Sequence, residues 1–283
     1  MGAAAPHSAR TGGSGDTATW TRAELGPGQA LDLITARFTT HRYAPHCHDE
    51  FALGICTGGS STIDYRGARH RVGPGSIVLL APGEAHTGGP TAGDGYAYRG
   101  LYPTMPLLTE GVTAAAHFRE PVIDDAELAA ALLAAHRSVS ATGERLEAES
   151  RLPPLLTALS RRHGRATPVR DVVPGTPGIA RAVRDRLADE LRAPPSLAEI
   201  GTDLGLSRYQ VLRAFRDAMG MPPYAWLAQH RVTRARALLA AGVRPAEAAA
   251  LVGFADQAHL TRWFRRVVGV TPAVYRAGVA GRG

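Results

Sequence analysis

Between residues 30 and 102, apolar residues occur in short runs or alternate with polar residues. Glycine and proline interrupt these runs at positions 58–59, 73–75 and 82–83. Alternation with a period of two, broken by such turn residues, is typical of β-strands. We therefore predict an all-β barrel or sandwich whose strands include residues 31–38, 51–56, 61–65, 70–72 and 76–80.

The apolar spacing changes to a helical period after residue 121. One predicted helix begins near residue 124 with acidic residues in its first turn, and its inner face carries Leu128, Leu132, Leu133 and His136. A second predicted helix begins near residue 144, and Pro153 and Pro154 are expected to kink or interrupt it. Both helices need an apolar surface to cover, either their own sheet or a second copy of the chain. We slightly favour the second copy, and thus a homodimer.

Helical spacing returns from residue 179 onwards, with the start and stop signals of short helices. Ser196 and Glu199 have the spacing of a capping box, Gly205 suits the left-handed end of that helix, and Ser207 caps the next one. A helix, a tight turn containing glycine and a second capped helix form a helix-turn-helix.

The same unit occurs a second time. Pro245 lies near the start of a helix, Gly253 supplies the turn and Asp256 is a good N-cap for residues 257–268. A long helix over residues 224–239 separates the two units and can hold them at a fixed distance. The repeats are unequal, because Gly205 and Phe215 are ten positions apart whereas Gly253 and Phe264 are eleven apart.

These patterns divide the chain into four segments. Residues 1–19 are rich in Ala, Gly, Ser and Thr and predict a disordered tail. Residues 20–163 form the β-rich domain with its helices, residues 164–178 carry Gly and Pro and predict a flexible linker, and residues 179–277 form the helical domain. The predicted fold class is therefore α+β with two domains.

Charge is distributed unevenly between these domains. Residues 1–175 contain 16 arginines and 17 acidic residues, whereas residues 176–283 contain 16 arginines and only 8 acidic residues, so the net charge of +7 arises in the C-terminal part. A basic helical domain favours nucleic acid or an anionic membrane surface as partner, although a solvated basic face is the simple alternative. The sequence has no apolar run of about 18 residues, and we expect no membrane partner.

Three histidines stand out in the β-rich part. The segments 45–50, with His46 and His48, and 75–86, which ends at His86, resemble the two motifs of the cupin fold, in which such histidines converge inside a small β-barrel. Metal-binding cupins have a Glu a few residues after the His pair, where this chain has Ala52 and Leu53, and Glu50 comes too early. We therefore expect these histidines to line an effector pocket without a metal or other cofactor, with a three-histidine metal site as the alternative.

The two cysteines, Cys47 and Cys56, are too few to make a disulfide framework, and they favour a reducing compartment such as the cytoplasm. A redox role for Cys47 between two histidines has no further support, because nothing else in the sequence argues for a lowered thiol pKa.

The helical domain carries a set of motifs at residues 204–207, 212–216, 220–224, 231–239, 252–266 and 269–272. Together these segments resemble the DNA-binding domain of the AraC/XylS family of bacterial transcription regulators. A cupin-like half followed by two helices resembles the family's effector and dimerisation region. The resemblance thus covers nearly the whole chain and implies a sequence-specific transcription regulator.

By that resemblance, the helices that begin after Ser207 and Asp256 enter successive major grooves, about 34 Å apart. The implied base-reading residues are Tyr209, Leu212, Arg213, Gln257, His259, Thr261 and Arg262. Arginine suits guanine and glutamine suits adenine, while Leu212 offers only apolar contact such as a thymine methyl. The implied phosphate contacts are Arg208, Arg216, Arg265 and Arg266. The alternatives are intramolecular salt bridges for Arg213 and Arg262, and an idle surface position for His259.

The predicted protein is a cytoplasmic regulator, not an enzyme, that binds double-stranded promoter DNA and a small-molecule effector, with RNA polymerase as a further possible partner. Two alternatives stay open. One is a metal-dependent cupin enzyme with a basic appendage, and the other is a constitutive DNA-binding protein without an effector.

Overall fold

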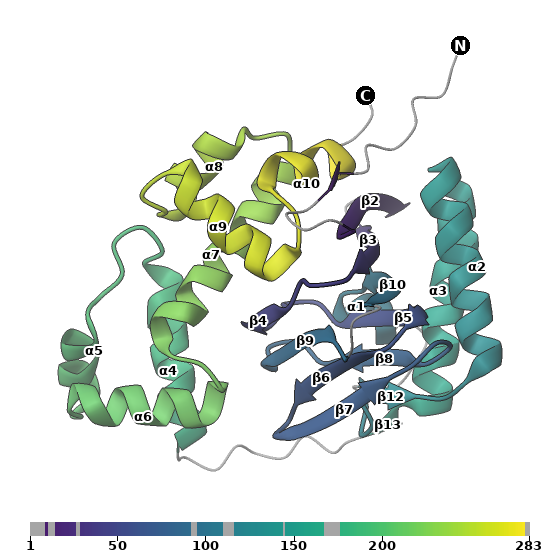
Figure 1. Cartoon of the computed structure of the whole chain (residues 1–283). Helices are drawn as coiled ribbons and strands as arrows, with labels where there is room; N and C mark the ends of the chain where they lie inside the picture. The colour runs from purple at the N-terminus through teal and green to yellow at the C-terminus, as the bar shows by residue number, and fades with distance from the viewer. Residues whose placement is uncertain are drawn as a thin grey trace.

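The computed structural model of the chain describes residues 9–10, 15–26, 29–91, 95–109, 116–143, 145–166 and 176–280. A β-rich N-terminal part lies between two long helices on one side and the C-terminal helices on the other (Figure 1). Among the described helices, none combines the length and the apolar character that a membrane span requires.

The N-terminal part contains two antiparallel sheets. The larger sheet has the strand order β1-β2-β3-β10-β5-β8-β12 and the smaller one β4-β9-β6-β7. Their strands are β1 Ala9–Arg10, β2 Thr17–Gly26, β3 Gln29–Phe38, β4 Tyr43–His46, β5 Ala52–Gly59, β6 Ser61–Tyr65, β7 Ala68–Val72, β8 Ile77–Leu80, β9 His86–Pro90, β10 Tyr96–Tyr102 and β12 Val122–Ile123. A separate short pair joins β11 (Ala116–His117) and β13 (Arg165–Ala166).

The two sheets face each other across a pocket lined by residues of both, as in a cupin-like jelly roll, and they do not join into one closed barrel. The five strands expected from alternation correspond to β3, β5, β6, β7 and β8. The fold class predicted from the sequence is confirmed: a β-rich domain with flanking helices precedes a helical domain.

Strands β2 and β3 are buried on both faces. On β3, Leu31 and Leu33 pack on one side with the long helices, whereas Ile34 and Phe38 pack on the other side with the C-terminal helices. Successive side chains of a strand point to opposite faces, so a strand with apolar residues at both odd and even positions needs a cover on each side. The fold supplies both covers.

The N-terminal helices cover the odd-numbered face. They are α1 (Met105–Thr109), α2 (Ala126–Thr142) and α3 (Arg145–His163), and the side chain of Asp125 caps α2 by accepting from the Leu128 amide at 3.0 Å. The inner leucines of α2 and α3 are buried against the chain's own sheet, so the slightly favoured expectation that a second copy covers them is wrong. Helix α3 continues through Pro153 and Pro154, so the predicted interruption is wrong; Leu152 and Leu156, both fully buried, hold the helix on the sheet across the prolines.

The C-terminal part is a run of seven described helices. They are α4 (Thr176–Asp189), α5 (Leu197–Leu204), α6 (Arg208–Met219), α7 (Pro223–Ala240), α8 (Pro245–Val252), α9 (Gln257–Val268) and α10 (Pro272–Val279). The predicted helix caps and turns are present: Ser196 and Ser207 each make a capping box, and Gly205 and Gly253 adopt φ of 66° and 88° at the two turns. Helices α5–α6 and α8–α9 are therefore the two helix-turn-helix units.

Two predicted segment boundaries are wrong. Residues 17–19, predicted as part of a disordered tail, belong to β2, because Ala18 and Trp20 bury their side chains and Asp16 accepts hydrogen bonds from both Thr39 and Thr40. The predicted linker, 164–178, also overlaps two regular elements, because Arg165–Ala166 pair as β13 and α4 begins at Thr176. Residues 1–8, 11–14 and 167–175 lie outside the described residues.

The second helix-turn-helix unit shares one apolar core with the even-numbered faces of β2 and β3. Trp20, Ile34 and Phe38 pack with side chains from α7 to α10, and the Trp20 indole donates to the Val268 carbonyl at 3.3 Å. The backbones approach closely as well, since a Cβ atom at Gly278 would lie 2.1 Å from the Trp20 carbonyl oxygen. The first unit has a smaller core of its own, and Cys47 and Ala85 of the N-terminal part pack against it.

A buried ion pair crosses this interface. Arg236 of α7 lies 2.8 Å from the Asp32 carboxylate of β3, and the Tyr275 hydroxyl of α10 donates to the same carboxylate at 2.5 Å. Arg22 binds the other carboxylate oxygen at 2.6 Å. Burial alone would raise the pKa of Asp32, but the charges of Arg236 and Arg22 lower it overall. The pair therefore stabilises the fold above the ordinary Asp pKa of about 3.9 and loses that contribution only as the pH falls further.

Replacement of Asp32 tests this interface. In Asp32→Asn, the buried Arg236 loses its nearest counter-charge, and we expect the free energy of unfolding of the full chain to fall by about 3 kcal/mol. Urea unfolding followed by tryptophan fluorescence would measure the change. The matched control is Asp64→Asn, because the partner of Asp64, Arg69, is exposed and its loss should change little. Equal effects of the two substitutions would contradict the assigned role of Asp32.

Candidate ligand pocket and nucleic-acid interface

Helix α6 presents one apolar and one polar face. Val211 and Phe215 are buried, whereas the side chains predicted to meet DNA lie on the other side. Of these, Arg208, Tyr209, Arg213 and Arg216 are exposed and Leu212 is half-buried. The Arg208 guanidinium lies 4.9 Å from the centre of the Tyr209 ring and donates to its hydroxyl at 2.9 Å, which pre-orders both side chains.

Helix α9 repeats this arrangement with different side chains. Leu260, Phe264 and Val267 are buried as predicted, and the exposed face carries Gln257, Arg262, Arg265 and Arg266. Two predicted base-reading residues are less accessible to DNA than these. His259 is half-buried with its ring 5.1 Å from that of Phe254, and the Thr261 hydroxyl donates to the Gln257 carbonyl at 2.8 Å.

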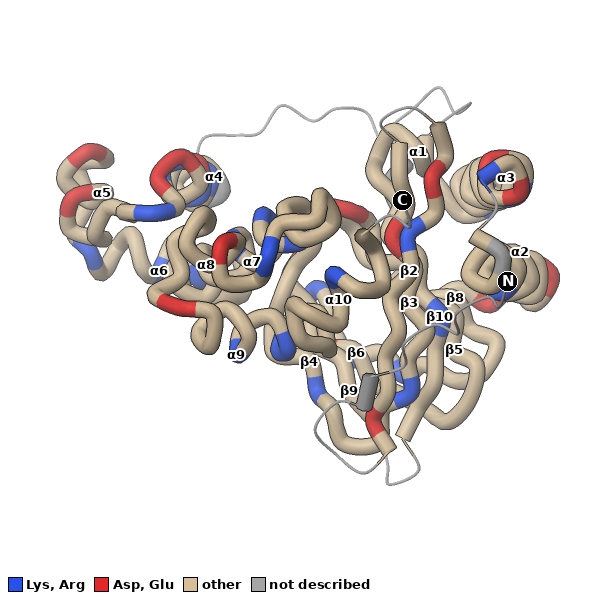
Figure 2. Tube along the Cα trace, turned by 90° about the horizontal axis from the view of Figure 1, so that it is seen from above, with Lys and Arg blue, Asp and Glu red and all other residues tan. Residues whose placement is uncertain are grey.

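Within the part of the chain that the structure describes, Arg213, Arg216, Arg262 and Arg265 form no ion pair. The alternative that Arg213 and Arg262 are held in intramolecular salt bridges therefore has no support from the described contacts. Basic positions recur along α6, α7 and α9 in the charge-coloured trace (Figure 2). Helices α6 and α9 thus each offer arginine side chains to a polyanion on one face, while the opposite face is packed in the core of the domain.

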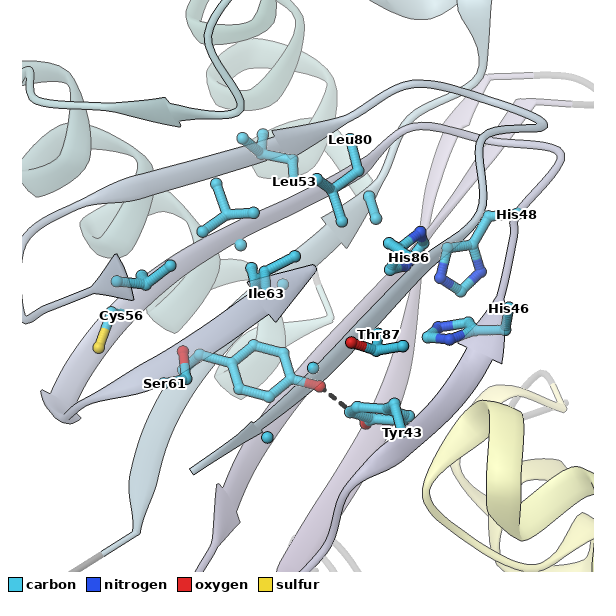
Figure 3. A pocket seen from close by; sticks show the side chains of 18 of the residues that line it. Tyr43, His46, His48, Leu53, Cys56, Ser61, Ile63, Leu80, His86 and Thr87 are labelled. Atoms are coloured by element: carbon cyan, nitrogen blue, oxygen red, sulfur yellow. Dashed lines mark hydrogen bonds between the residues drawn. The ribbon is translucent and has the colours of Figure 1, made fainter. Parts of the chain in front are cut away.

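The pocket between the two sheets has a volume of about 100 Å³. Histidines gather at one end of it, and Leu53, Ile63 and Leu80 lie further inside (Figure 3). No side chain among its described lining residues carries a formal charge at neutral pH.

The sheet register brings the three predicted histidines together. His46 on β4 pairs with His86 on the antiparallel strand β9, and His48 follows two residues later on the same side. The ring centres of His46 and His86 are 4.2 Å apart, and His48 lies within 5.2 Å of both. They expose 3%, 9% and 6% of their surface in chain order. Burial lowers the pKa of all three imidazoles, that of His86 to about 4.

Glu50 does not reach this cluster. Its carboxylate lies 3.6 Å from Arg236, in the domain interface. Cys47 and Cys56 are both free thiols, and burial raises the pKa of Cys47 to about 12. A thiolate at Cys47 is therefore disfavoured, which agrees with the expectation that it has no redox role.

Several pocket residues were not predicted from the sequence. Tyr96, Tyr98 and Tyr102 alternate along β10 and all face the pocket, and the Tyr98 and Tyr43 hydroxyls are 2.9 Å apart. The period of two in these tyrosines was the signal that could have revealed them. Val267 of α9 also lines the pocket. It comes from the helical domain, so no local pattern could place it there.

Helix α7 is tied to the histidine-bearing strand by Gln229. Its side-chain amide donates to the Pro45 carbonyl at 2.6 Å and accepts from the Cys47 amide at 3.1 Å. Gln229 is 2% exposed, so both hydrogen bonds are made away from water. The segment that carries His46 and His48 thus has a direct attachment to the helix that joins the two helix-turn-helix units.

Comparison with known proteins agrees with a ligand-binding N-terminal part and a helix-turn-helix C-terminal part. Residues 28–156 match the family model of the AraC-like ligand binding domain, and residues 200–278 match that of a helix-turn-helix domain. The chain is 27% identical over 243 residues to the HTH-type transcriptional regulator YbfI of Bacillus subtilis, covering 84% of this chain and 88% of that protein. It is 25% identical over 242 residues to the arabinose operon regulatory protein of Salmonella typhimurium, covering 81% and 84%.

Solved structures show a similar fold. ToxT from Vibrio cholerae O395 superposes with a TM-score of 0.53 at 10% identity, covering 95% of this chain and all of that one. ToxT with a bound unsaturated fatty acid gives a TM-score of 0.52 at 12% identity, covering 96% and 99%.

The fold and its two surfaces define a DNA-binding transcription regulator with an N-terminal ligand-binding domain and a C-terminal pair of helix-turn-helix units. The chain belongs to the AraC family of these regulators.

The buried histidines predict a pH dependence of stability. The unfolded chain takes up a proton on His86 below about pH 6.5, whereas the folded chain excludes it until about pH 4, so the free energy of unfolding should decrease as the pH falls through this window. A shift of this size corresponds to about 3 kcal/mol. Urea unfolding between pH 7.5 and 4.5, in the presence of a chelator, would measure the decrease. His86→Leu should show a flatter profile, and an unchanged profile would contradict a neutral buried His86.

Proposed function

We propose that the chain binds promoter DNA with α6 and α9 in successive major grooves and responds to a small molecule in the pocket. It acts as a binding protein without a catalytic role. The observation that carries this proposal is the position of α9. Its exposed face carries Gln257 and Arg262, and at its inner end Val267 forms part of the pocket wall. One helix thus takes part in both surfaces.

The residue types divide the DNA contacts into two groups. Arg213, Arg262 and Gln257 read base edges, because their side chains can form paired hydrogen bonds with guanine or adenine. The remaining predicted base-reading side chains contact the bases beside them mainly through shape and apolar contact: Tyr209, Leu212, His259 and Thr261. The remaining arginines neutralise phosphates and position the domain without reading sequence: Arg208, Arg216, Arg265 and Arg266.

The two units differ in their exposed residues, so the proposed DNA site is asymmetric. One half is read by an aromatic, an aliphatic and a basic side chain (Tyr209, Leu212 and Arg213), and the other by an amide and a basic one (Gln257 and Arg262). The two halves lie about one helical turn of DNA apart. A palindrome is therefore not required within the site of a single chain.

Pocket occupancy can reach the DNA-binding helices through direct contacts. Tyr102 lines the pocket, and its ring lies 5.6 Å from the Arg236 guanidinium at the domain interface. Tyr43 also lines the pocket, and a Cβ atom at Gly269, at the end of α9, would lie 2.9 Å from its hydroxyl. A ligand that displaces either tyrosine must therefore change the contact between the domains.

The pocket restricts the class of effector. One fold relative, ToxT, has been solved with an unsaturated fatty acid, but the described lining residues here include no cation for a carboxylate. We infer a compact effector with an apolar body beside Leu53 and Leu80 and one polar end at the histidines and tyrosines.

Assembly and location complete the proposal. We propose a homodimer in the cytoplasm that can contact RNA polymerase when bound at a promoter. The dimer is supported by the resemblance of the N-terminal half to the effector and dimerisation region of the family, and Leu146 at the start of α3, which is 74% exposed, is the position at which we test it. A promoter-binding protein must have access to the chromosome, which supports the cytoplasm.

Paired arginine substitutions test the division of DNA contacts. Arg262→Ala should cost about 1–3 kcal/mol of discrimination at one base pair. Arg265→Ala should weaken binding to all sequences alike and reduce the slope of log affinity against log salt by about 1. Fluorescence anisotropy with a duplex selected from random sequences, and with its single-base variants, would measure both effects. Arg69→Ala, exposed on the N-terminal domain, is the control. Identical behaviour of the first two variants would refute the assignment.

The proposed dimer can be tested by light scattering after size-exclusion chromatography. The wild-type chain should elute at twice its mass of 29.8 kDa, and Leu146→Asp should elute as a monomer. Leu251→Asp is the matched control, because Leu251 is also an exposed leucine but lies on α8. A wild-type monomer at micromolar concentration, or an unaffected dimer in Leu146→Asp, would rule out this interface.

A further inference from the structure

We propose that His46, His48 and His86 bind a divalent transition-metal ion at the end of the pocket. Each of the three imidazoles offers a nitrogen, and these nitrogens all lie within 4.8 Å of one another. All three residues are buried and come from two paired strands, β4 and β9, with the segment that follows β4. The juxtaposition is therefore built by the sheet and does not depend on chance contacts of surface side chains.

The distances fit an ion after a small movement. A metal–imidazole bond is about 2.0–2.1 Å long, so two nitrogens on one tetrahedral ion lie about 3.4 Å apart. Nitrogens that span up to 4.8 Å must therefore close by about 1.4 Å at the widest pair. Rotation of the side chains, together with a small movement of the segment that follows β4, can supply such a shift.

Hydrogen bonds to the backbone set two of the rings in the form that a metal requires. The His46 Nδ1 atom lies 2.8 Å from the Ala44 carbonyl, and the His86 Nδ1 atom lies 3.1 Å from the Glu84 carbonyl. A carbonyl can only accept, so each Nδ1 carries the proton and each Nε2 keeps its lone pair. Histidines that bind metals usually donate their other ring nitrogen in this way.

The ligand set selects the kind of ion. Three imidazoles and no carboxylate suit Zn²⁺, Co²⁺, Ni²⁺ or Fe²⁺, whereas Mg²⁺ and Ca²⁺ prefer oxygen ligands. Asp49, which directly follows His48, is exposed, and the Glu50 carboxylate lies 3.6 Å from Arg236 instead. Three protein ligands leave at least one position open toward the pocket. The ion would supply a formal charge to a pocket whose described lining residues have none.

If the regulatory role proposed above holds, the ion would also be connected to both helix-turn-helix units. Cys47, between His46 and His48, and Ala85, just before His86, pack against the core of the first unit. Gln229 of α7 hydrogen-bonds to the backbone on both sides of His46. Drawing the histidines together would therefore shift the surface on which the first unit rests relative to the second. The open position would accept an oxygen or nitrogen donor of the effector.

Metal binding can be tested on the full chain without DNA. The purified protein is treated with a chelator, dialysed and titrated with Co²⁺, and the visible absorption of the protein-bound ion is recorded. Zn²⁺ is then added as a competitor, and bound metal is counted by elemental analysis. We expect one ion per chain and displacement of Co²⁺ by Zn²⁺. His86→Ala and His48→Ala should each weaken binding by more than about 100-fold, since loss of a second-shell partner alone costs 10–100-fold.

The control is His70→Ala, because His70 lies on β7 outside the pocket lining and its loss should leave the Co²⁺ spectrum unchanged. Circular dichroism shows whether each variant folds, and His86→Gln replaces a variant that does not. Absence of bound Co²⁺ in the wild-type protein, or equal binding by folded His86 variants, would overturn the proposal. DNA affinity measured with and without Zn²⁺ is a separate readout: DNA binding without any metal effect would remove only the coupling, and metal binding without DNA binding would instead contradict the proposed function.

Discussion

The arrangement of the whole chain depends on one buried cation. Arg236 lies on the helix between the two helix-turn-helix units, and its charge is removed from water within a ring of aromatic side chains. A buried charge of this kind is tolerated only with a counter-charge and hydrogen-bonding partners. Its partner, Asp32, belongs to the other domain.

Such an ion pair contributes more to the specificity of the domain arrangement than to the free energy of unfolding. The cost of taking two ions out of water offsets much of their attraction, so a buried pair adds little net stability compared with apolar residues. A misplaced domain, however, would leave the charge unpaired. The pair thus selects one docking position, and that position places Val267 in the pocket wall and Gln229 against the strand that carries His46.

Much of the fold followed from local patterns. The capping boxes at Ser196 and Ser207, the glycine turns and the alternating strands depend on neighbours in sequence, and the predictions from them agree with the structure. The failures have a common cause. Trp20 lies in a segment whose composition predicts disorder, but it is buried by helices nearly 250 residues later, and the prolines of α3 are held in a helix by leucines on the sheet.

The pocket shows the same limit. The three histidines could be grouped from their spacing, because paired strands bring them together. The position of Glu50 could not be predicted, since its partner is Arg236 in the other domain. The tyrosines of β10 carried a recognisable alternation, whereas Val267 and Gln229 depend wholly on how the domains dock. The positions of residues that share one element could therefore be predicted from the sequence. The positions of residues that join elements of different domains could not.

The two-sided burial of β2 and β3 limits how this protein can be recombined. In a modular regulator, a DNA-binding domain can be exchanged at the linker and still fold in its new context. Here, Ile34 and Phe38 complete the core of the second helix-turn-helix unit while Leu31 and Leu33 of the same strand complete that of the sensing domain. A hybrid with a different helical domain would leave Ile34 and Phe38 without the side chains that cover them, so an exchange of domains would also require changes on the even-numbered faces of β2 and β3.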